Sequence, residues 1–219
     1  KINKRAATAG GKRSFKEELL YGFHVMRHPF DGFWDLKHEK RGSLRAAIVY
    51  LLVAIVAAYY EDIGTGYVMN PSISYSSIVS VALNSVLTPV LLFSVANWCL
   101  TTLFDGEGSF KDIVIAVSYS LLPMIMLQIP ATILSNMVTS TESSIVELII
   151  NFGLIWTGML IFLGMMVTHD YSLFKSVLTT IGTIVAITFI IFVGILFGTL
   201  LAKIVSFVTN IIIEINYRM

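Results

Sequence analysis

The stretch that decides the fold is NWCLTTLFDGEGSFKDIVIAVSYSLLPMIMLQIP, residues 97–130. It joins two long uncharged runs, residues 77–104 and 113–137, through the polar segment 105–112. Each run exceeds the roughly 20 residues that a helix needs to cross a hydrocarbon core about 30 Å thick. The polar segment cannot lie in lipid, because irregular backbone would lack hydrogen-bond partners there. The stretch therefore predicts a transmembrane helical hairpin with a short turn in water.

The residues of this turn predict its local geometry. Ser109 is the expected N-cap of the returning helix, and Gly106 and Gly108 are expected to supply positive φ angles. The acids of the turn are also opposite in charge to the cations of residues 37–41, so the turn is expected to lie near residues 33–43.

The composition indicates a membrane protein. The chain has 219 residues, of which 56% are hydrophobic and 13% charged, with a mean hydropathy of +0.80. A soluble domain carries about 25% charged residues. The single cysteine, Cys99, lies inside an apolar run, which excludes a disulfide framework and a cysteine-based metal site.

The basic residues predict the orientation in the membrane. Of the 15 Lys and Arg residues, eleven lie within the first 45 positions, and Lys111 and Lys175 follow in turns expected on the same side. The other two loops, residues 61–76 and 136–144, contain none. Since cytoplasmic loops carry the excess of basic residues, we predict an all-α protein with its N-terminus inside and its C-terminus outside. The five spans are expected at residues 43–60, 77–104, 113–137, 145–168 and 176–201.

The predicted membrane domain, residues 43–202, is flanked by two other segments. Residues 1–42 are expected to form a basic cytoplasmic tail and an amphipathic interfacial helix, which begins with a capping box at Ser14 and ends before Pro29. After it, Phe33 and Trp34 are expected to anchor the chain among lipid headgroups.

Residues 203–219 continue the last apolar run with a polar stripe: Ser206, Asn210, Glu214 and Arg218 recur at an interval of four. One straight helix over residues 176–219 would be about 66 Å long, about twice the thickness of a bilayer core. The chain must therefore bend near Gly194, Gly198 or Lys203, or project outward. The segment is predicted to be either an interfacial helix or a docking helix.

No pattern typical of catalysis appears. The chain has no Ser-His-Asp, paired-carboxylate or HEXXH arrangement, and His24, His28 and His38 lack the partners of a metal site. We expect no enzyme activity, no cofactor, no metal and no nucleic-acid partner. Pro89, Pro123 and Pro130 could break helices around a transport site or simply kink them.

Three segments carry a family resemblance. SYSLLPMIM (residues 118–126), GEGSFKD (106–112) and HPFDGFWDLKHEKRGS (28–43) resemble the Yip (Ypt-interacting protein) domain family, and the last resembles its bacterial members most. The likeness covers roughly residues 30–202 and implies a non-enzymatic, polytopic membrane protein that associates with other proteins.

The resemblance implies two classes of partner. Eukaryotic members are linked to Rab-type GTPases and vesicle traffic, but their DLYGPFW-like signature is absent here and only the pair Phe33-Trp34 remains. Bacterial relatives resemble companions of sugar ABC importers, which implies permease subunits as partners.

We therefore expect a multi-pass scaffold or accessory subunit of the cell membrane that contacts the bilayer and other integral membrane proteins. The alternatives are a trafficking adaptor for Rab-type GTPases and a small-solute transporter or channel. The transporter would be favoured by a hydrated cavity near Asn84, Asn97 and Gln128. The candidate interface residues are Phe33, Trp34, Asp105, Gly108, Ser109, Tyr119, Pro123, Ser206, Asn210 and Glu214.

Overall fold

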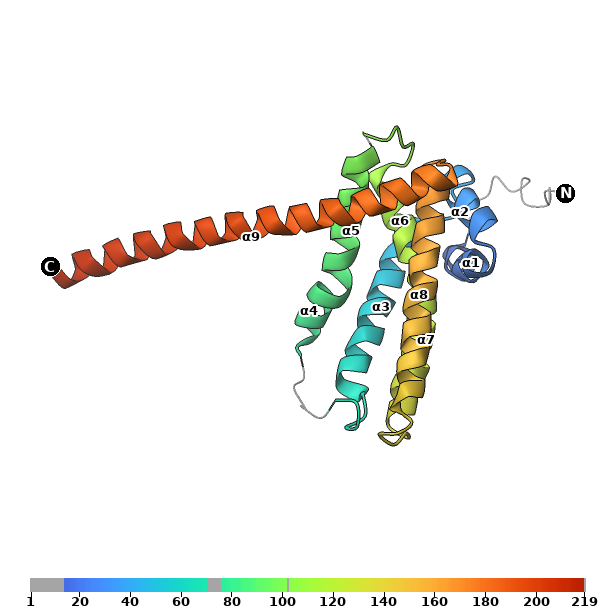
Figure 1. Cartoon of the computed structure of the whole chain (residues 1–219), viewed down its shortest axis with the longest axis horizontal. Helices are drawn as coiled ribbons and strands as arrows, with labels where there is room; N and C mark the ends of the chain where they lie inside the picture. Colours follow the sequence, from blue (N-terminus) through green and yellow to red (C-terminus); the bar gives the residue numbers. More distant parts are fainter. Residues whose placement is uncertain (1–13, 71–75, 102, 219) are drawn as a thin grey trace.

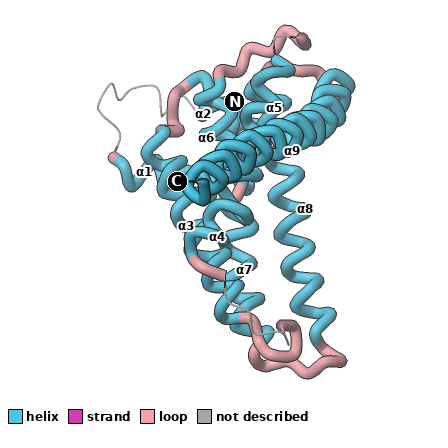
Figure 2. Tube along the Cα trace, turned by 90° about the vertical axis from the view of Figure 1, so that its left-hand side faces the viewer, coloured by secondary structure: helices cyan, strands magenta, loops and turns pink. Residues whose placement is uncertain are grey.

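A computed structural model describes residues 14–70, 76–101 and 103–218 of the chain. In these residues every regular element is a helix and no strand occurs. Four helical rods run side by side as an upright bundle, two short helices pack at one end, and one long helix projects sideways (Figure 1). Figure 2, a view from the side, shows the loops gathered at the two ends of the bundle. Five helical segments are long and apolar enough to cross a membrane, which confirms the predicted number.

The four rods correspond to the first four predicted spans. The first is a single helix and so is the fourth, whereas the second and third are interrupted. In chain order they are α3 (Leu44–Gly64); α4 (Ile78–Val81), η2 (Ala82–Leu87) and α5 (Thr88–Thr101); α6 (Phe110–Ser120) and α7 (Leu122–Ser135); and α8 (Ser143–Thr168).

Serine side chains cap the N-termini of several of these helices. Ser43 Oγ accepts a hydrogen bond from the Ala46 N–H at 3.1 Å. Ser109 forms a reciprocal capping box with Asp112, as its position before an apolar run predicts. The helix α1 (Phe15–Arg27) also begins where expected, but Ser14 makes no side-chain capping bond, so the capping box predicted there is wrong.

The second rod contains a π-helix, η2, immediately before Pro89. A proline inside a helix removes one backbone donor, and its ring crowds the carbonyl four residues earlier. The wider π turn accommodates this: the Thr88 N–H donates to the Leu83 carbonyl, five residues back. In the third rod the break falls at Leu121, and Pro123 lies in the first turn of α7, where its missing N–H is tolerated.

The core forms around the third rod. In α6, Ile113 and Tyr119 are completely buried, and they belong to the same apolar cluster as Ala46 and Tyr50 of α3. The Tyr119 hydroxyl donates to the Glu18 carbonyl at 3.0 Å, and its ring lies 4.9 Å from that of Tyr50. These contacts attach α1 to the end of the bundle.

The second short helix, α2 (Pro29–His38), contains the pair Phe33-Trp34. Phe33 is only 1% exposed, and a Cβ added to Gly164 of α8 would lie 3.0 Å from its ring. Phe33 is therefore a core residue, and the expectation that it anchors the chain among headgroups is wrong. Trp34, on the adjacent position of the helix, is 49% exposed.

The hairpin turn differs from the prediction in one respect. No described glycine has a positive φ angle, and the left-handed residue of this turn is Asp105, with φ 48°. The glycines serve close packing instead: a Cβ on Gly106 would lie 2.3 Å from the Tyr171 hydroxyl, and one on Gly108 would lie 2.7 Å from His169 Cε1. The turn therefore needs glycine because of its neighbours rather than its backbone angles.

The predicted proximity of this turn to the N-terminal segment is confirmed. Lys37 Nζ lies 3.2 Å from Glu107 Oε2, across 70 positions of sequence. The Glu107 side chain is 67% exposed, so this ion pair contributes at most about 1 kcal/mol and mainly fixes how the segments meet.

The fifth segment, α9 (Leu173–Arg218), is one continuous helix of 46 residues. It passes Gly194, Gly198 and Lys203, and the predicted boundary between residues 202 and 203, without interruption. The bend predicted near these residues is therefore absent from the helix. The helix runs across the end of the bundle that carries α1 and α2, contacts α5 and α8 near its start, and then leaves the bundle (Figure 1).

Cysteine labelling tests the orientation. Among the described residues of the bundle, Lys and Arg lie at the α1–α2 end and none lies near the opposite loops. We therefore predict that cysteines at Glu107 and Asp170 react from the cytoplasm and that cysteines at Tyr67 and Ser140 react from outside. If α9 crosses the membrane as a fifth span, a cysteine at Asn216 should also react from outside. Labelling of Ser140→Cys from the cytoplasm would contradict the predicted orientation.

Candidate functional site

The structure separates the candidate interface residues into two groups. Phe33, Gly108, Tyr119 and Pro123 are buried within the chain, where they shape the fold itself. The others are exposed: Trp34, Asp105 and Ser109 at the α1–α2 end, and Ser206, Asn210 and Glu214 on the projecting part of α9. Only the exposed residues are available to a partner, and they do not form one continuous patch.

A buried chain of polar groups, which we term the polar junction, joins the hairpin turn to three helices. It consists of Gly108, His169, Asn97, Thr183 and Thr179. The Gly108 N–H donates to His169 Nδ1 at 3.2 Å, and His169 Nε2 lies 2.8 Å from Asn97 Oδ1. Asn97 Nδ2 then donates to Thr183 Oγ1 at 3.2 Å, and Thr183 donates to the Thr179 carbonyl at 2.8 Å.

The geometry assigns the tautomer of His169. A backbone N–H can only donate, so Nδ1 must accept, and the ring proton lies on Nε2, which donates to Asn97. His169 is 1% exposed, and burial, together with the nearby charge of Lys37, lowers its pKa to about 4. The neutral ring connects the turn, α5 and the end of α8, and Asn97 extends this connection to α9. The polar junction therefore fixes the point from which α9 departs.

The shifted histidine predicts a pH dependence. Because the folded-state pKa is below the ordinary value of 6.5, the unfolded chain takes up a proton between pH 6.5 and 4 that the folded chain does not. Stability conferred by His169 is therefore complete above about pH 6.5 and falls with decreasing pH, by up to about 1.4 kcal/mol per pH unit. Thermal unfolding in mild detergent at pH 7.5 and 5.5 should show this loss. The same comparison with His169→Gln should show a smaller one, and equal losses in both proteins would contradict the assignment.

The sequence did not predict the polar junction because His169 lies in a polar turn, where a histidine is expected to be exposed to water. The available signal was Asn97 together with Thr183. Each is a polar side chain in the apolar part of a span, where a buried polar group requires a partner.

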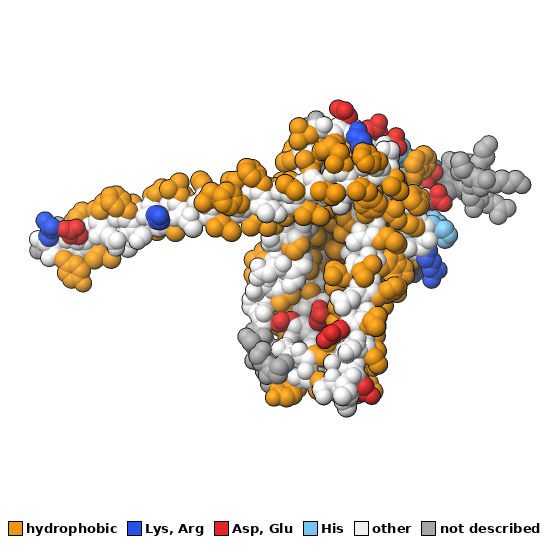
Figure 3. All heavy atoms as spheres, in the orientation of Figure 1, with side chains coloured by type: hydrophobic (Ala, Val, Ile, Leu, Met, Phe, Trp, Pro, Cys, Tyr) orange, Lys and Arg blue, Asp and Glu red, His pale blue; other side chains and the backbone are white. Residues whose placement is uncertain are grey.

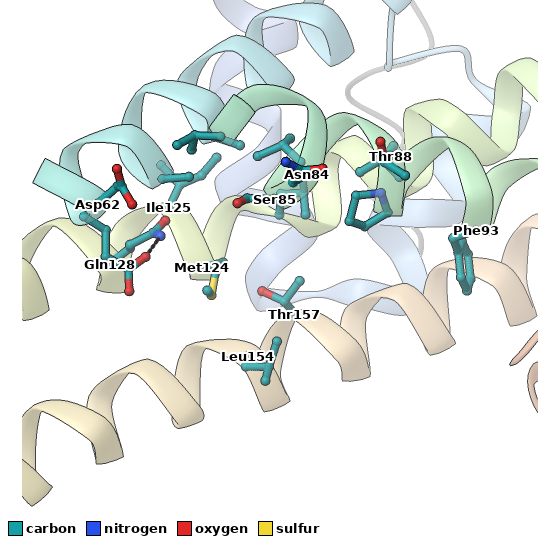
Figure 4. Close-up of a pocket in the computed structure, with 18 of the residues that line it drawn as sticks. Asp62, Asn84, Ser85, Thr88, Phe93, Met124, Ile125, Gln128, Leu154 and Thr157 are labelled. Carbon is teal, nitrogen blue, oxygen red and sulfur yellow. Dashed lines mark hydrogen bonds between the residues drawn. The ribbon is translucent and has the colours of Figure 1, made fainter. Parts of the chain in front are cut away.

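A second feature is a cavity of about 980 Å³ inside the bundle. It lies between α3, η2–α5, α6–α7 and α8, and Asn84 and Gln128, two of the three residues named for a possible transport site, line it. Figure 4 shows Asn84 facing the cavity from one side and Thr157 facing it from α8, with the Gln128 hydrogen bond at one end. Asn97 belongs to the polar junction instead.

The third feature is the surface of α9. Every residue from 191 to 218 is exposed, and the whole helix is apolar, with a mean hydropathy of 2.8 in its most hydrophobic part. Figure 3 shows hydrophobic side chains along its entire length. The charged residues of this exposed part are Lys203, Glu214 and Arg218, of which the last two form an ion pair with each other.

The described residues contain no group of three His, Cys, Asp or Glu side chains that could hold a metal ion. Taken together, the helical bundle, the five apolar segments and the basic end define a polytopic membrane protein. The Yip1 domain model matches residues 23–196, and the chain therefore belongs to the Yip1 domain family. No curated protein and no solved structure matches the chain.

Proposed function

We propose that this protein is a non-catalytic scaffold or accessory subunit of the cell membrane, which packs against other polytopic membrane proteins through α9. One observation carries the proposal: residues 191–218 form an apolar helix in which every residue is exposed in the described structure. The predicted orientation places the N-terminal segment in the cytoplasm.

The length of α9 argues against a simple fifth span. Its 46 residues correspond to about 69 Å of helix, more than twice the ~30 Å of hydrocarbon in a bilayer. A tilt within the usual range cannot place all of it in lipid. The part that remains outside needs another apolar surface, since its side chains would otherwise face water.

The composition of α9 argues against a helix that lies in the headgroup layer. Interfacial helices have a broad, strongly charged face. In the exposed part of α9 the charged residues are Lys203, Glu214 and Arg218 alone, and most of the remaining side chains are apolar. A polytopic partner would cover both the apolar sides and the polar stripe of Ser206, Asn210 and Glu214, because packing and modest polar contacts drive association of helices in membranes.

The family resemblance supports the class of partner. Permease subunits of a bacterial sugar importer are polytopic and would offer the apolar helices that α9 requires. Purification of the full chain in gentle detergent, followed by mass spectrometry, should recover one polytopic protein in a constant ratio. Recovery of this chain alone, over several mild detergents, would argue against the proposal.

The cavity supports a second candidate function, transport of a small solute. Asn84 and Gln128 line it, as a transport site would require, but its inner walls are apolar. Reconstitution of the protein alone separates the two functions. Solute flux that Asn84→Ala abolishes would favour a transporter, and absence of flux would favour the scaffold.

A further inference from the structure

The cavity has two chemically different parts. Its outer end, away from α1 and α2, is polar and contains the acids Glu61 and Asp62, with Gln128 opposite them. Its inner part is apolar and is lined by Val86, Phe93, Val117, Met124, Leu154 and Ile161. Figure 3 shows acidic side chains in the lower half of this hollowed face, below α9.

The two acids are bonded only to neutral groups in the described structure. Glu61 accepts a hydrogen bond from Gln128 Nε2, and Asp62 Oδ2 accepts one from the Ser76 N–H at 2.9 Å. No described Lys, Arg or His lies within ion-pair distance of either carboxylate. Both acids also lie in the last turn of α3, where the helix dipole is negative and opposes a carboxylate. This end of the cavity therefore favours a cation.

A further polar atom in the wall lacks a partner. Thr157 of α8 is 6% exposed and faces the cavity, and its hydroxyl makes no hydrogen bond with any residue that the structure describes (Figure 4). A buried hydroxyl without a partner is unfavourable, so a polar group of a bound molecule would stabilise it. Across the cavity, the π-helix η2 presents Asn84 and Ser85, and such helices are frequent at functional sites.

We propose that this cavity binds an amphipathic cation, a molecule with an ammonium group on a hydrocarbon body. The ammonium lies at Glu61 and Asp62, and the hydrocarbon lies between η2–α5 and α8. A volume of about 980 Å³ suits one drug-sized molecule or one acyl chain with its headgroup. This inference goes beyond the scaffold role and does not require a partner of residues 191–218 of α9.

Three probes with the same alkyl chain and different polar groups test the proposal: dodecylamine, dodecanol and dodecanoate. Their equilibrium binding to the purified full chain in a neutral maltoside detergent is measured at pH 7.5. The amine should bind about tenfold more tightly than the alcohol, because charge-assisted hydrogen bonds are the stronger ones, and the carboxylate should bind least. Equal binding of amine and alcohol would overturn the proposal.

Variants assign the preference to the two acids. The double variant Glu61→Gln/Asp62→Asn should bind the amine only as well as the alcohol and leave alcohol binding unchanged. The matched control is Glu147→Gln. Glu147 is an exposed acid of α8 that lies at the same end of the bundle as Glu61 and Asp62 but does not line the cavity. An amine preference that survives the double variant, or is lost equally in the control, would overturn the assignment.

If the double variant fails to fold, Thr157→Phe provides a second measurement. The larger side chain fills the apolar part of the cavity, so binding of both amine and alcohol should be lost. Unchanged binding of both probes to Thr157→Phe would place them outside the cavity and refute the proposal.

The ammonium could come from a lipid headgroup or from a soluble amine. Native mass spectrometry of the protein from nanodiscs of phosphatidylethanolamine and phosphatidylglycerol distinguishes these sources. Retention of phosphatidylethanolamine that depends on Glu61 and Asp62 supports a lipid ligand. Dodecylamine binding without such retention supports a soluble one, and preferential retention of phosphatidylglycerol in the cavity would contradict a cation site.

Discussion

Replacement of His169 by leucine is expected to destabilise the protein by about 4 kcal/mol. The leucine would leave the Gly108 N–H and the side-chain oxygen Oδ1 of Asn97 without their present partners, in a region where His169 is 1% exposed. A buried polar group that loses its partner costs about 1–3 kcal/mol, and two are lost here. Unfolding in mild detergent, followed by circular dichroism, measures the effect.

Two variants separate this effect from a general change of polarity. His38→Leu removes an exposed histidine whose described contacts are with Trp34 of its own helix, a stacked ring and a backbone carbonyl, and it should change stability by no more than about 0.5 kcal/mol. His169→Gln retains a donor for Asn97 but loses the acceptor for Gly108, so it should be intermediate. A loss in His169→Leu no greater than that in His38→Leu would show that the polar junction does not stabilise the fold.

Removal of residues 203–219 is expected to weaken recovery of the polytopic partner by at least about tenfold, if α9 docks as we propose. Many positions share the energy of helix association in membranes, so a whole segment must be removed to produce a large effect. Stability of the remaining chain should stay the same, because every described residue from 203 to 218 is exposed. Quantitative mass spectrometry of co-purified proteins measures the recovery.

Asn84→Ala is the matched control for this truncation. Asn84 lines the cavity and, among the described residues, its side chain bonds to that of Ser80, so its loss should leave partner recovery unchanged. Full recovery with the shortened chain would exclude residues 203–219 from the interface. A shortened chain that unfolds more readily would show instead that the segment supports the fold.

The main features of the fold were predictable from the sequence because they depend on local, one-dimensional signals. An uncharged run of sufficient length predicts a span, and a serine before such a run predicts a helix start, as at Ser43 and Ser109. Opposite charges also placed the turn correctly, since Lys37 and Glu107 meet in the structure.

The site was less predictable because its features depend on contacts between distant segments. The sequence suggests positive φ angles for Gly106 and Gly108, whereas both glycines make room for residues of the turn after α8. It suggests an exposed aromatic at Phe33, but Gly164 of α8 provides space that buries the ring. The residue type was visible in each case, but the neighbouring residue that decides its environment was not.

The direction of α9 was also beyond the sequence. Its hydropathy predicts a fifth span, and its length predicts either a bend or a projection. The place where α9 crosses the end of the bundle depends on the polar junction, in which His169 bonds Asn97 and Asn97 bonds Thr183 of α9. No local pattern encodes that geometry.

Site-specific photocrosslinking in intact membranes tests the central claim most directly. A photoreactive residue is placed at Phe197 and, separately, at Phe207, both exposed on α9, with Ile155 as a control on the exposed surface of α8. The scaffold account predicts an adduct with the same polytopic protein at both α9 positions and none at Ile155. Adducts only with lipid or with a second copy of this chain, or equal adducts at all three positions, would contradict it.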